Sequence, residues 1–109
     1  MEIRFKSSRI QKSCNSERES VRAWGTLNAR KLRQRLAELS AAETLEGMRK
    51  LPAARCHPLK GDRAGQFAVD LAHPYRLVFE PANNPVPKKN DGGIDLEKIT
   101  SITILSVED

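Results

Sequence analysis

The chain has 109 residues, a length that suits one domain, residues 1–109, with a single hydrophobic core. Hydrophobic residues make up 39% and charged residues 30% of the sequence, which is ordinary for a soluble globular protein and excludes wholesale disorder. No apolar run reaches the length of a membrane span, and the N-terminal residues lack the apolar core of a signal peptide. We therefore expect a cytoplasmic protein with no membrane partner.

The net charge of +5 is unevenly distributed along the chain. Residues 1–63 carry 15 Lys or Arg and 7 Asp or Glu, a net charge of +8, whereas residues 64–109 carry 4 and 7, a net charge of −3. This asymmetry favours an anionic partner for the first half, with nucleic acid as the first candidate. Solvated helix faces would give the same asymmetry, so charge alone does not separate the two interpretations.

The sequence has neither a disulfide framework nor a metal-ligand pattern. Its two cysteines, Cys14 and Cys56, are too few for a disulfide scaffold and lack the CxxC spacing of zinc sites, so we expect buried free thiols. The two histidines, His57 and His73, stand among scattered carboxylates without ligand spacing. We therefore predict no metal and no cofactor.

The first half of the chain has mainly helical periodicity. Residues Glu2–Lys6 alternate apolar and polar side chains and predict a short strand. Helical spacing begins at Arg9, and Ser16 followed by Glu19 either caps a second helix or lies within one long helix. Gly25 is expected to end this segment.

The helical segment after Gly25 has an apolar face and a basic face. Its apolar side chains recur every three or four residues and predict core packing: Ala29, Leu32, Leu36 and Leu39. Its other face could meet a phosphate backbone or an acidic partner and holds Arg30, Lys31, Arg33, Gln34 and Arg35. A third short helix, Glu43–Lys50, is expected to end before Pro52.

The second half of the chain switches to the two-residue periodicity of strands. Phe67–Leu71 and Tyr75–Glu80 each alternate apolar and polar side chains, and the His73-Pro74 turn between them predicts an antiparallel hairpin. Pro81–Gly93 is rich in Pro, Asn, Lys and Gly and predicts a surface loop. Lys98–Val107 is rich in β-branched residues with apolar groups on both faces, as expected for a strand inside a sheet.

Together these elements predict an α+β fold: one strand, two or three helices, then three antiparallel strands, with the helices on one face of the sheet. The other face would present Arg76 and the segment around His57 and Lys60. That segment joins the helical half to the sheet half of the chain.

These basic residues suit the cleavage of RNA without a metal. The 2′-hydroxyl attacks the adjacent phosphorus while a base removes its proton, and cations stabilise the charge that develops on the phosphorane. His57 suits the base, because its imidazole titrates near neutral pH. Lys60, Arg63 and Arg76 suit the cations, and Asp109 could supply a carboxylate. The plainer interpretation is that His57 is structural or merely exposed, since a histidine beside a proline usually is.

Three stretches carry a family resemblance: Cys-His-Pro-Leu-Lys-Gly-Asp-Arg-Ala-Gly-Gln-Phe (56–67), Tyr-Arg-Leu-Val-Phe-Glu-Pro (75–81) and Ile-Leu-Ser-Val-Glu-Asp (104–109). On these stretches the chain resembles the RelE/ParE superfamily of bacterial toxins, in its HigB-type (plasmid maintenance killer protein) branch. The likeness is most specific over residues 51–81 and the final strand. It implies N-terminal helices packed on one face of a small, mainly antiparallel sheet.

The resemblance also implies an activity and partners. Active members of the family are ribosome-dependent endoribonucleases (mRNA interferases) that cut mRNA in the ribosomal A site. A cognate antitoxin neutralises them, often a HigA-like protein with a helix-turn-helix DNA-binding domain. The expected partners are therefore the antitoxin, the ribosome and mRNA.

Residue by residue, His57 and Lys60 match the family's catalytic loop. Arg76 matches the strand that supplies a phosphate-binding arginine, and Asp109 matches the aspartate of a terminal Asp-Tyr-His motif. Five further basic residues complete the predicted RNA-binding set: Arg63, Arg55, Arg30, Lys31 and Arg33. The sequence departs from the family at Asp109, its last residue, because the Tyr and His of the motif do not follow it. Without those two residues we expect weakened or abolished cleavage.

Three hypotheses about function follow. The first is an mRNA interferase toxin, which the set of His57, Lys60 and Arg76 favours. The second is a non-enzymatic ParE-like toxin that inhibits DNA gyrase and would need neither His57 nor Asp109. The third is a catalytically weakened toxin that only forms a regulatory complex with its antitoxin.

Overall fold

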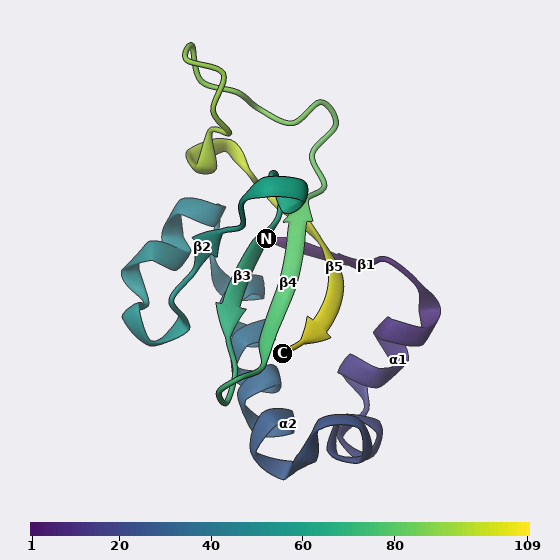
Figure 1. Cartoon of the computed structure of the whole chain (residues 1–109). Helices are drawn as coiled ribbons and strands as arrows, with labels where there is room; N and C mark the ends of the chain where they lie inside the picture. The colour runs from purple at the N-terminus through teal and green to yellow at the C-terminus, as the bar shows by residue number, and fades with distance from the viewer.

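A computed structural model describes residues 1–109 and shows one five-stranded sheet with helices packed on one of its faces (Figure 1). The strands lie in the order β1-β5-β4-β3-β2. Their bounds are β1 Glu2–Phe5, β2 His57–Pro58, β3 Phe67–Asp70, β4 Arg76–Pro81 and β5 Ser101–Glu108. The α-helices are α1 Ser8–Asn15 and α2 Glu17–Ala41. Four short 3-10 helices are η1 Leu45–Lys50, η2 Pro52–Ala54, η3 Gly61–Arg63 and η4 Leu96–Lys98.

The predicted α+β class and the mainly antiparallel sheet are confirmed. Strands β2, β3, β4 and β5 pair antiparallel in turn, and only β1 pairs parallel, with β5. Two details differ from the prediction. His57–Pro58 forms a short edge strand, β2, and the last strand begins at Ser101 because η4 occupies Leu96–Lys98.

The two α-helices are separated by a cap and the second is bent at a glycine. The Ser16 hydroxyl accepts a hydrogen bond from the Glu19 amide at 3.2 Å, so Ser16 starts a second helix and does not lie within one long helix. Gly25 has φ 86° and ψ 165°, outside the helical region, and helix continues on both sides of it. The positive φ is one that glycine adopts readily because it has no Cβ. None of the helices combines the length and hydrophobicity that a membrane span requires.

The core lies between the helices and one face of the sheet. Helix α2 contributes the predicted stripe, in which Ala29, Leu32 and Leu39 are buried and Leu36 is half-buried. The sheet contributes alternating side chains from three strands: Phe67, Val69, Leu77, Phe79, Ile102 and Ile104. The Phe67 and Phe79 rings stack with their centroids 6.1 Å apart. The predicted third helix is 3-10 in form, η1, and it buries Leu45 and Met48.

Two buried polar side chains of α2 tie the helix to the sheet. The prediction that Arg35 lies on the basic face is wrong: the side chain is only 3% exposed, because it donates to the carbonyl oxygens of Asp70 at 2.8 Å and Ala53 at 2.9 Å. Asn28 accepts from the Ala72 amide at 2.9 Å, which fixes the turn between β3 and β4. The helix layer therefore sets the position of the strand ends and turns that surround the opposite face.

The predicted loop, Pro81–Gly93, projects from the end of the sheet (Figure 1). The Asn83 side chain anchors its base by accepting from the amides of Thr100 at 3.1 Å and Ser101 at 3.2 Å. Near its tip, Lys88 and Ile94 form an isolated antiparallel bridge. The loop is thus fixed at its base and closed near its tip.

Candidate active site on the open face of the sheet

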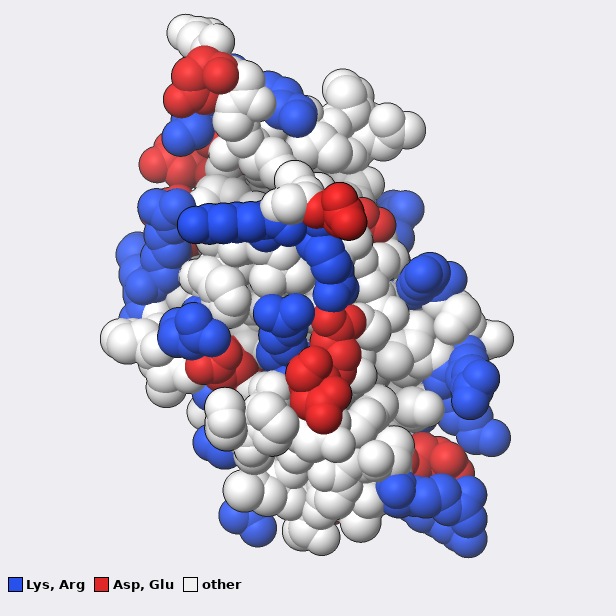
Figure 2. Space-filling view, in the orientation of Figure 1, with Lys and Arg blue, Asp and Glu red and all other residues white.

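The face of the sheet opposite the helices carries two rows of side chains that strand register aligns. One row holds three charged residues: Asp70 of β3, Arg76 of β4 and Glu108 of β5. The next row holds a histidine and three small residues: His57 of β2, Ala68 of β3, Val78 of β4 and Ser106 of β5. Paired residues point to the same face, and Leu77 and Phe79 point to the core, so both rows lie on the other side. We call this side the open face; basic side chains surround a short acidic strip on it in Figure 2.

The Glu108 carboxylate joins two arginines from distant parts of the chain. Arg63 of η3 donates from Nη1 to Oε1 of Glu108 and from Nη2 to Oε2, the latter at 3.1 Å. Arg76 donates from Nη2 to Oε1 at 3.3 Å, and Ser106 Oγ donates to Oε2 at 2.6 Å. The carboxylate therefore ties η3 to β4 and β5.

These contacts keep Glu108 ionised. The hydrogen bonds from Arg63, and then those from Ser106 and Arg76, outweigh burial and lower the pKa of Glu108 from 4.5 to about 2. The hydrogen bond to Glu108 raises the pKa of Arg63 in turn. At neutral pH two cations thus share one anion, and the cluster retains a surplus positive charge.

A second ion pair borders the open face at Arg55. Its guanidinium donates from Nε to Asp70 Oδ2 at 2.8 Å and from Nη2 to Oδ1 at 3.0 Å. The Arg55 backbone is left-handed, with φ 45°, which is uncommon for a residue with a Cβ. Arg35 supports this geometry because it binds the carbonyl oxygens of both Asp70 and Ala53, two residues before Arg55.

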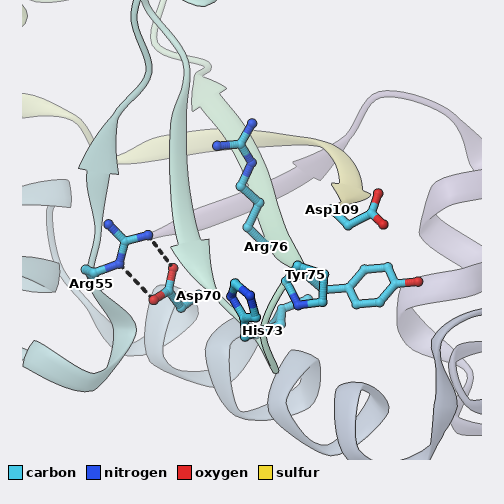
Figure 3. Close-up of a pocket in the computed structure, with 8 residues that line it drawn as sticks. Arg55, Asp70, His73, Tyr75, Arg76 and Asp109 are labelled. Carbon is cyan, nitrogen blue, oxygen red and sulfur yellow. Dashed lines mark hydrogen bonds and ion pairs between the residues drawn. The ribbon is translucent and has the colours of Figure 1, made fainter.

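A hollow of about 380 Å³ opens next to these pairs, at the turn between β3 and β4 (Figure 3). Its lining is mostly polar or aromatic: Arg55, Asp70, Leu71, His73, Pro74, Tyr75, Arg76 and Asp109. Figure 3 shows Arg76 extending from β4 between Asp70 on one side and Asp109 on the other. Beyond its single bond to Glu108, the Arg76 guanidinium has no other protein partner. Its remaining N–H donors are therefore available to an anion.

His57 lies in the row next to that of Arg76 on the open face, and Lys60 directly precedes η3. The Nδ1 atom of His57 is 2.8 Å from the Arg55 carbonyl oxygen. A carbonyl only accepts, so Nδ1 carries the proton and Nε2 of the neutral ring keeps a free lone pair. Lys60 is exposed and forms no ion pair. His57 lies two strands from Arg76, roughly 10 Å across the sheet at ordinary strand spacing.

The two thiols do not contribute a nucleophile. Cys14 is buried and Cys56 is half-buried, and both are free, as predicted. Burial raises the pKa of each thiol to about 11, so both are protonated at neutral pH. No group of three or more His, Cys, Asp or Glu side chains is arranged to hold a metal ion.

Comparison with known proteins identifies the family. A family model described as the RelE-like toxin of the type II toxin–antitoxin system HigB matches residues 5–90. The chain belongs to this HigB-like toxin family. A toxin of a type II system implies an antitoxin partner, and the predicted family is confirmed. The match ends before β5, so it does not include Glu108 or Asp109.

The HigB-like toxin also has the fold of known toxins in this superfamily. A YoeB/ParE toxin from Agrobacterium tumefaciens matches with a TM-score of 0.52, over 99% of this chain and 96% of that chain, at 14% sequence identity. At that identity the likeness concerns the fold alone. A search among curated proteins found no match.

The structure divides the predicted site residues of this HigB-like toxin into two groups. Six lie on or beside the open face: His57, Lys60, Arg76, Asp109, Arg63 and Arg55. The other three lie on α2, in the helix layer behind the sheet: Arg30, Lys31 and Arg33. Arg33 pairs with Glu17 at 2.8 Å, whereas Arg30 and Lys31 form no ion pair.

Sequence reasoning missed Glu108 and Tyr75 and treated His73 as a turn residue only. The charged row could not be read from local pattern, because Arg63 and Arg76 are 45 and 32 positions from Glu108. A partial signal exists in β5, where Ser106 and Glu108, two of its four polar residues, are two residues apart and so share a face. Tyr75 and His73 join the site only because the β3–β4 turn bends beside Asp109.

Proposed function

We propose that this HigB-like toxin is a ribosome-dependent endoribonuclease that cleaves mRNA by attack of the 2′-hydroxyl, without a metal. The observation that carries this proposal is the open face itself. It combines a histidine with a free Nε2 lone pair, an unpaired lysine and an arginine with unused donors. These are the groups that phosphodiester transesterification requires when no metal supplies charge.

We assign each group a step. Nε2 of His57 accepts the proton of the 2′-hydroxyl as the oxygen attacks phosphorus. Lys60 and Arg76 bind the nonbridging oxygens and stabilise their growing negative charge. As the bond between phosphorus and the 5′-oxygen breaks, the departing oxygen takes a proton from water, and the carboxylate of Asp109, exposed at the rim of the hollow, orients that water.

The remaining basic residues are proposed to hold RNA. Arg55 and Arg63 border the reacting phosphodiester on the open face. On the helix layer, exposed Arg30 and Arg33 and half-buried Lys31 would meet ribosomal RNA, since cations at the surface add sequence-independent affinity for phosphates. A HigA-like antitoxin with a helix-turn-helix domain is the proposed neutralising partner, and the cytoplasm is the proposed location.

Incubation of the purified toxin with translating ribosomes and a defined message tests this function. We expect the message to be cut within the ribosome-bound region and the upstream product to end in a 2′,3′-cyclic phosphate. A 3′-hydroxyl end would contradict attack by the 2′-hydroxyl. His57→Gln should cut slowly, and His73→Gln is the matched control because His73 also lies near Arg76 but is not the assigned base.

Other outcomes point to the other hypotheses. Intact message together with gyrase-dependent DNA breaks would support a gyrase inhibitor. Intact message, intact DNA and tight binding to the antitoxin would support a toxin that only forms a regulatory complex.

A further inference from the structure

We propose that Glu108 is a built-in competitor for RNA: its carboxylate occupies an anion site between Arg63 and Arg76 that a phosphodiester of the substrate takes over. This inference rests on the proposed ribonuclease function, because it names how access to the same site is controlled. It assigns a role to a carboxylate that the catalytic scheme does not use.

The geometry around Glu108 is that of a bound anion. Two guanidinium groups converge on one carboxylate, one through two N–H donors and the other through a single donor at 3.3 Å. A hydroxyl, from Ser106, donates to the same carboxylate at 2.6 Å. Phosphate oxygens accept bonds from paired arginines in the same way, so the donor set fits either anion.

The site is accessible enough for exchange. The side chains of Arg63, Arg76 and Glu108 are 38%, 34% and 27% exposed, so none is sealed in the core. Arg76 also faces the hollow, where it has unused donors. A phosphodiester arriving there can bind Arg76 first and then displace the carboxylate from Arg63.

Displacing the Glu108 carboxylate costs free energy, and this cost would let the toxin discriminate between RNA substrates. The carboxylate repels incoming phosphate and accepts from both terminal nitrogens of Arg63, whose Nε already binds Gln66. Free RNA therefore meets a partly neutralised site. RNA whose other contacts already hold it in place, as on the ribosome, therefore completes the exchange at a lower concentration than free RNA does.

Binding of a 2′-O-methyl RNA oligonucleotide, which lacks the attacking hydroxyl, tests the proposal apart from cleavage. Measured by fluorescence anisotropy at low salt, Glu108→Gln should bind on the order of tenfold more tightly than wild type, because one nearby negative charge is removed. The affinity of Glu108→Gln for the oligonucleotide should also fall more steeply with salt concentration than that of wild type.

Two matched variants make the test specific. Glu80→Gln removes the same charge from the open face, two strand positions beyond Val78. Because Glu80 forms no ion pair, the affinity of this variant for the oligonucleotide should differ little from that of wild type. Adding Arg63→Gln to Glu108→Gln should abolish the gain, because the vacated site loses a main donor. Equal tightening by Glu80→Gln, or no tightening by Glu108→Gln, would overturn the proposal.

A measurement on the unaltered protein covers the case in which Glu108→Gln does not fold. The Nε–Hε signals of Arg63 and Arg76 in NMR spectra should both shift as the oligonucleotide is added. Binding that leaves the Arg63 signal in place would overturn the exchange. Because neither readout needs cleavage, failure of the ribonuclease function would appear separately, as intact message on ribosomes.

Discussion

The two layers of this HigB-like toxin carry basic residues in different states. On the open face, Arg55 and Arg63 are held in ion pairs, which fix their positions and cancel much of their charge. In the helix layer, Arg33 pairs with Glu17 and Arg35 with Glu38, whereas Arg30 and Lys31 have no ion-pair partner. Fixed groups suit a reaction that needs exact placement, and unpaired exposed groups suit loose attraction to a polyanion. Lys60 of the open face is unpaired as well, so the comparison teaches that neither the number of cations nor their ion pairs locates an active site; the grouping of side chains by strand register does.

Arg35 is the buried arginine of the helix layer, and removing it should have the largest effect on the fold. Arg35→Met leaves the carbonyl oxygens of Asp70 and Ala53 without their buried donor. We expect a loss of about 3 kcal/mol in the free energy of unfolding, measured by urea denaturation. Arg33→Met removes an exposed arginine two residues away on the same helix. It should lower the free energy of unfolding by less than about 0.5 kcal/mol. Equal losses of unfolding free energy for Arg35→Met and Arg33→Met would contradict a special structural role for buried Arg35.

Lys60 should have the largest effect on the reaction among residues without a structural partner. Lys60→Ala is expected to lower the single-turnover rate of message cleavage by about a hundredfold, as loss of one charge-stabilising donor does elsewhere. Its unfolding free energy should not change, because Lys60 is exposed and unpaired. The control is Lys98→Ala, which removes an exposed lysine of η4. A wild-type rate for Lys60→Ala would exclude Lys60 from the site.

The Glu108 cluster should appear in the dependence of stability on pH. The pKa of Glu108 is lowered to about 2, so its stabilising effect is full above the unfolded value near 4.5 and fades as pH falls toward 2. Wild type should exceed Glu108→Gln by about 1 kcal/mol at pH 7, allowing for solvent screening, and the gap should shrink below pH 4.5 and close as pH falls through about 2. Urea unfolding at both pH values measures this. A gap that stays constant with pH would contradict the ionised cluster.

The helix layer should show the smallest effect. Arg30→Ala combined with Lys31→Ala is expected to weaken ribosome binding about threefold at low salt, because each exposed cation contributes little. The cleavage rate at saturating toxin should stay at the wild-type value. A large drop in that saturated rate would place the helix layer in the reaction and remove the distinction between the two faces.

Much of the fold could be predicted because local periodicity determines it. Phe67, Val69, Leu77 and Phe79 alternate with polar or small residues, and all four are buried against the helices. The parallel pairing of β1 with β5 could not be predicted in this way. The pairing depends on where β5 lies after α2 and the β3–β4 hairpin have formed. The residues Glu2–Phe5 contain no local pattern that specifies this partner.

The candidate site was only partly predictable for a similar reason. His57, Lys60 and Arg76 stand out by residue type and by resemblance to the family. Glu108 does not, since its importance comes from two arginines that only the folded register brings to it. Sequence identified the cations, and the structure identified the anion that holds two of them.

The saturated cleavage rate of Arg76→Ala on translating ribosomes tests most directly whether the open face is the site of the reaction. Arg76 is suited to this test because it contacts Glu108 through one bond and otherwise faces the hollow. We predict a folded protein that binds ribosomes within a few-fold of wild type and cuts the message about a hundredfold more slowly. A wild-type rate from a folded Arg76→Ala protein would contradict the assignment of the open face.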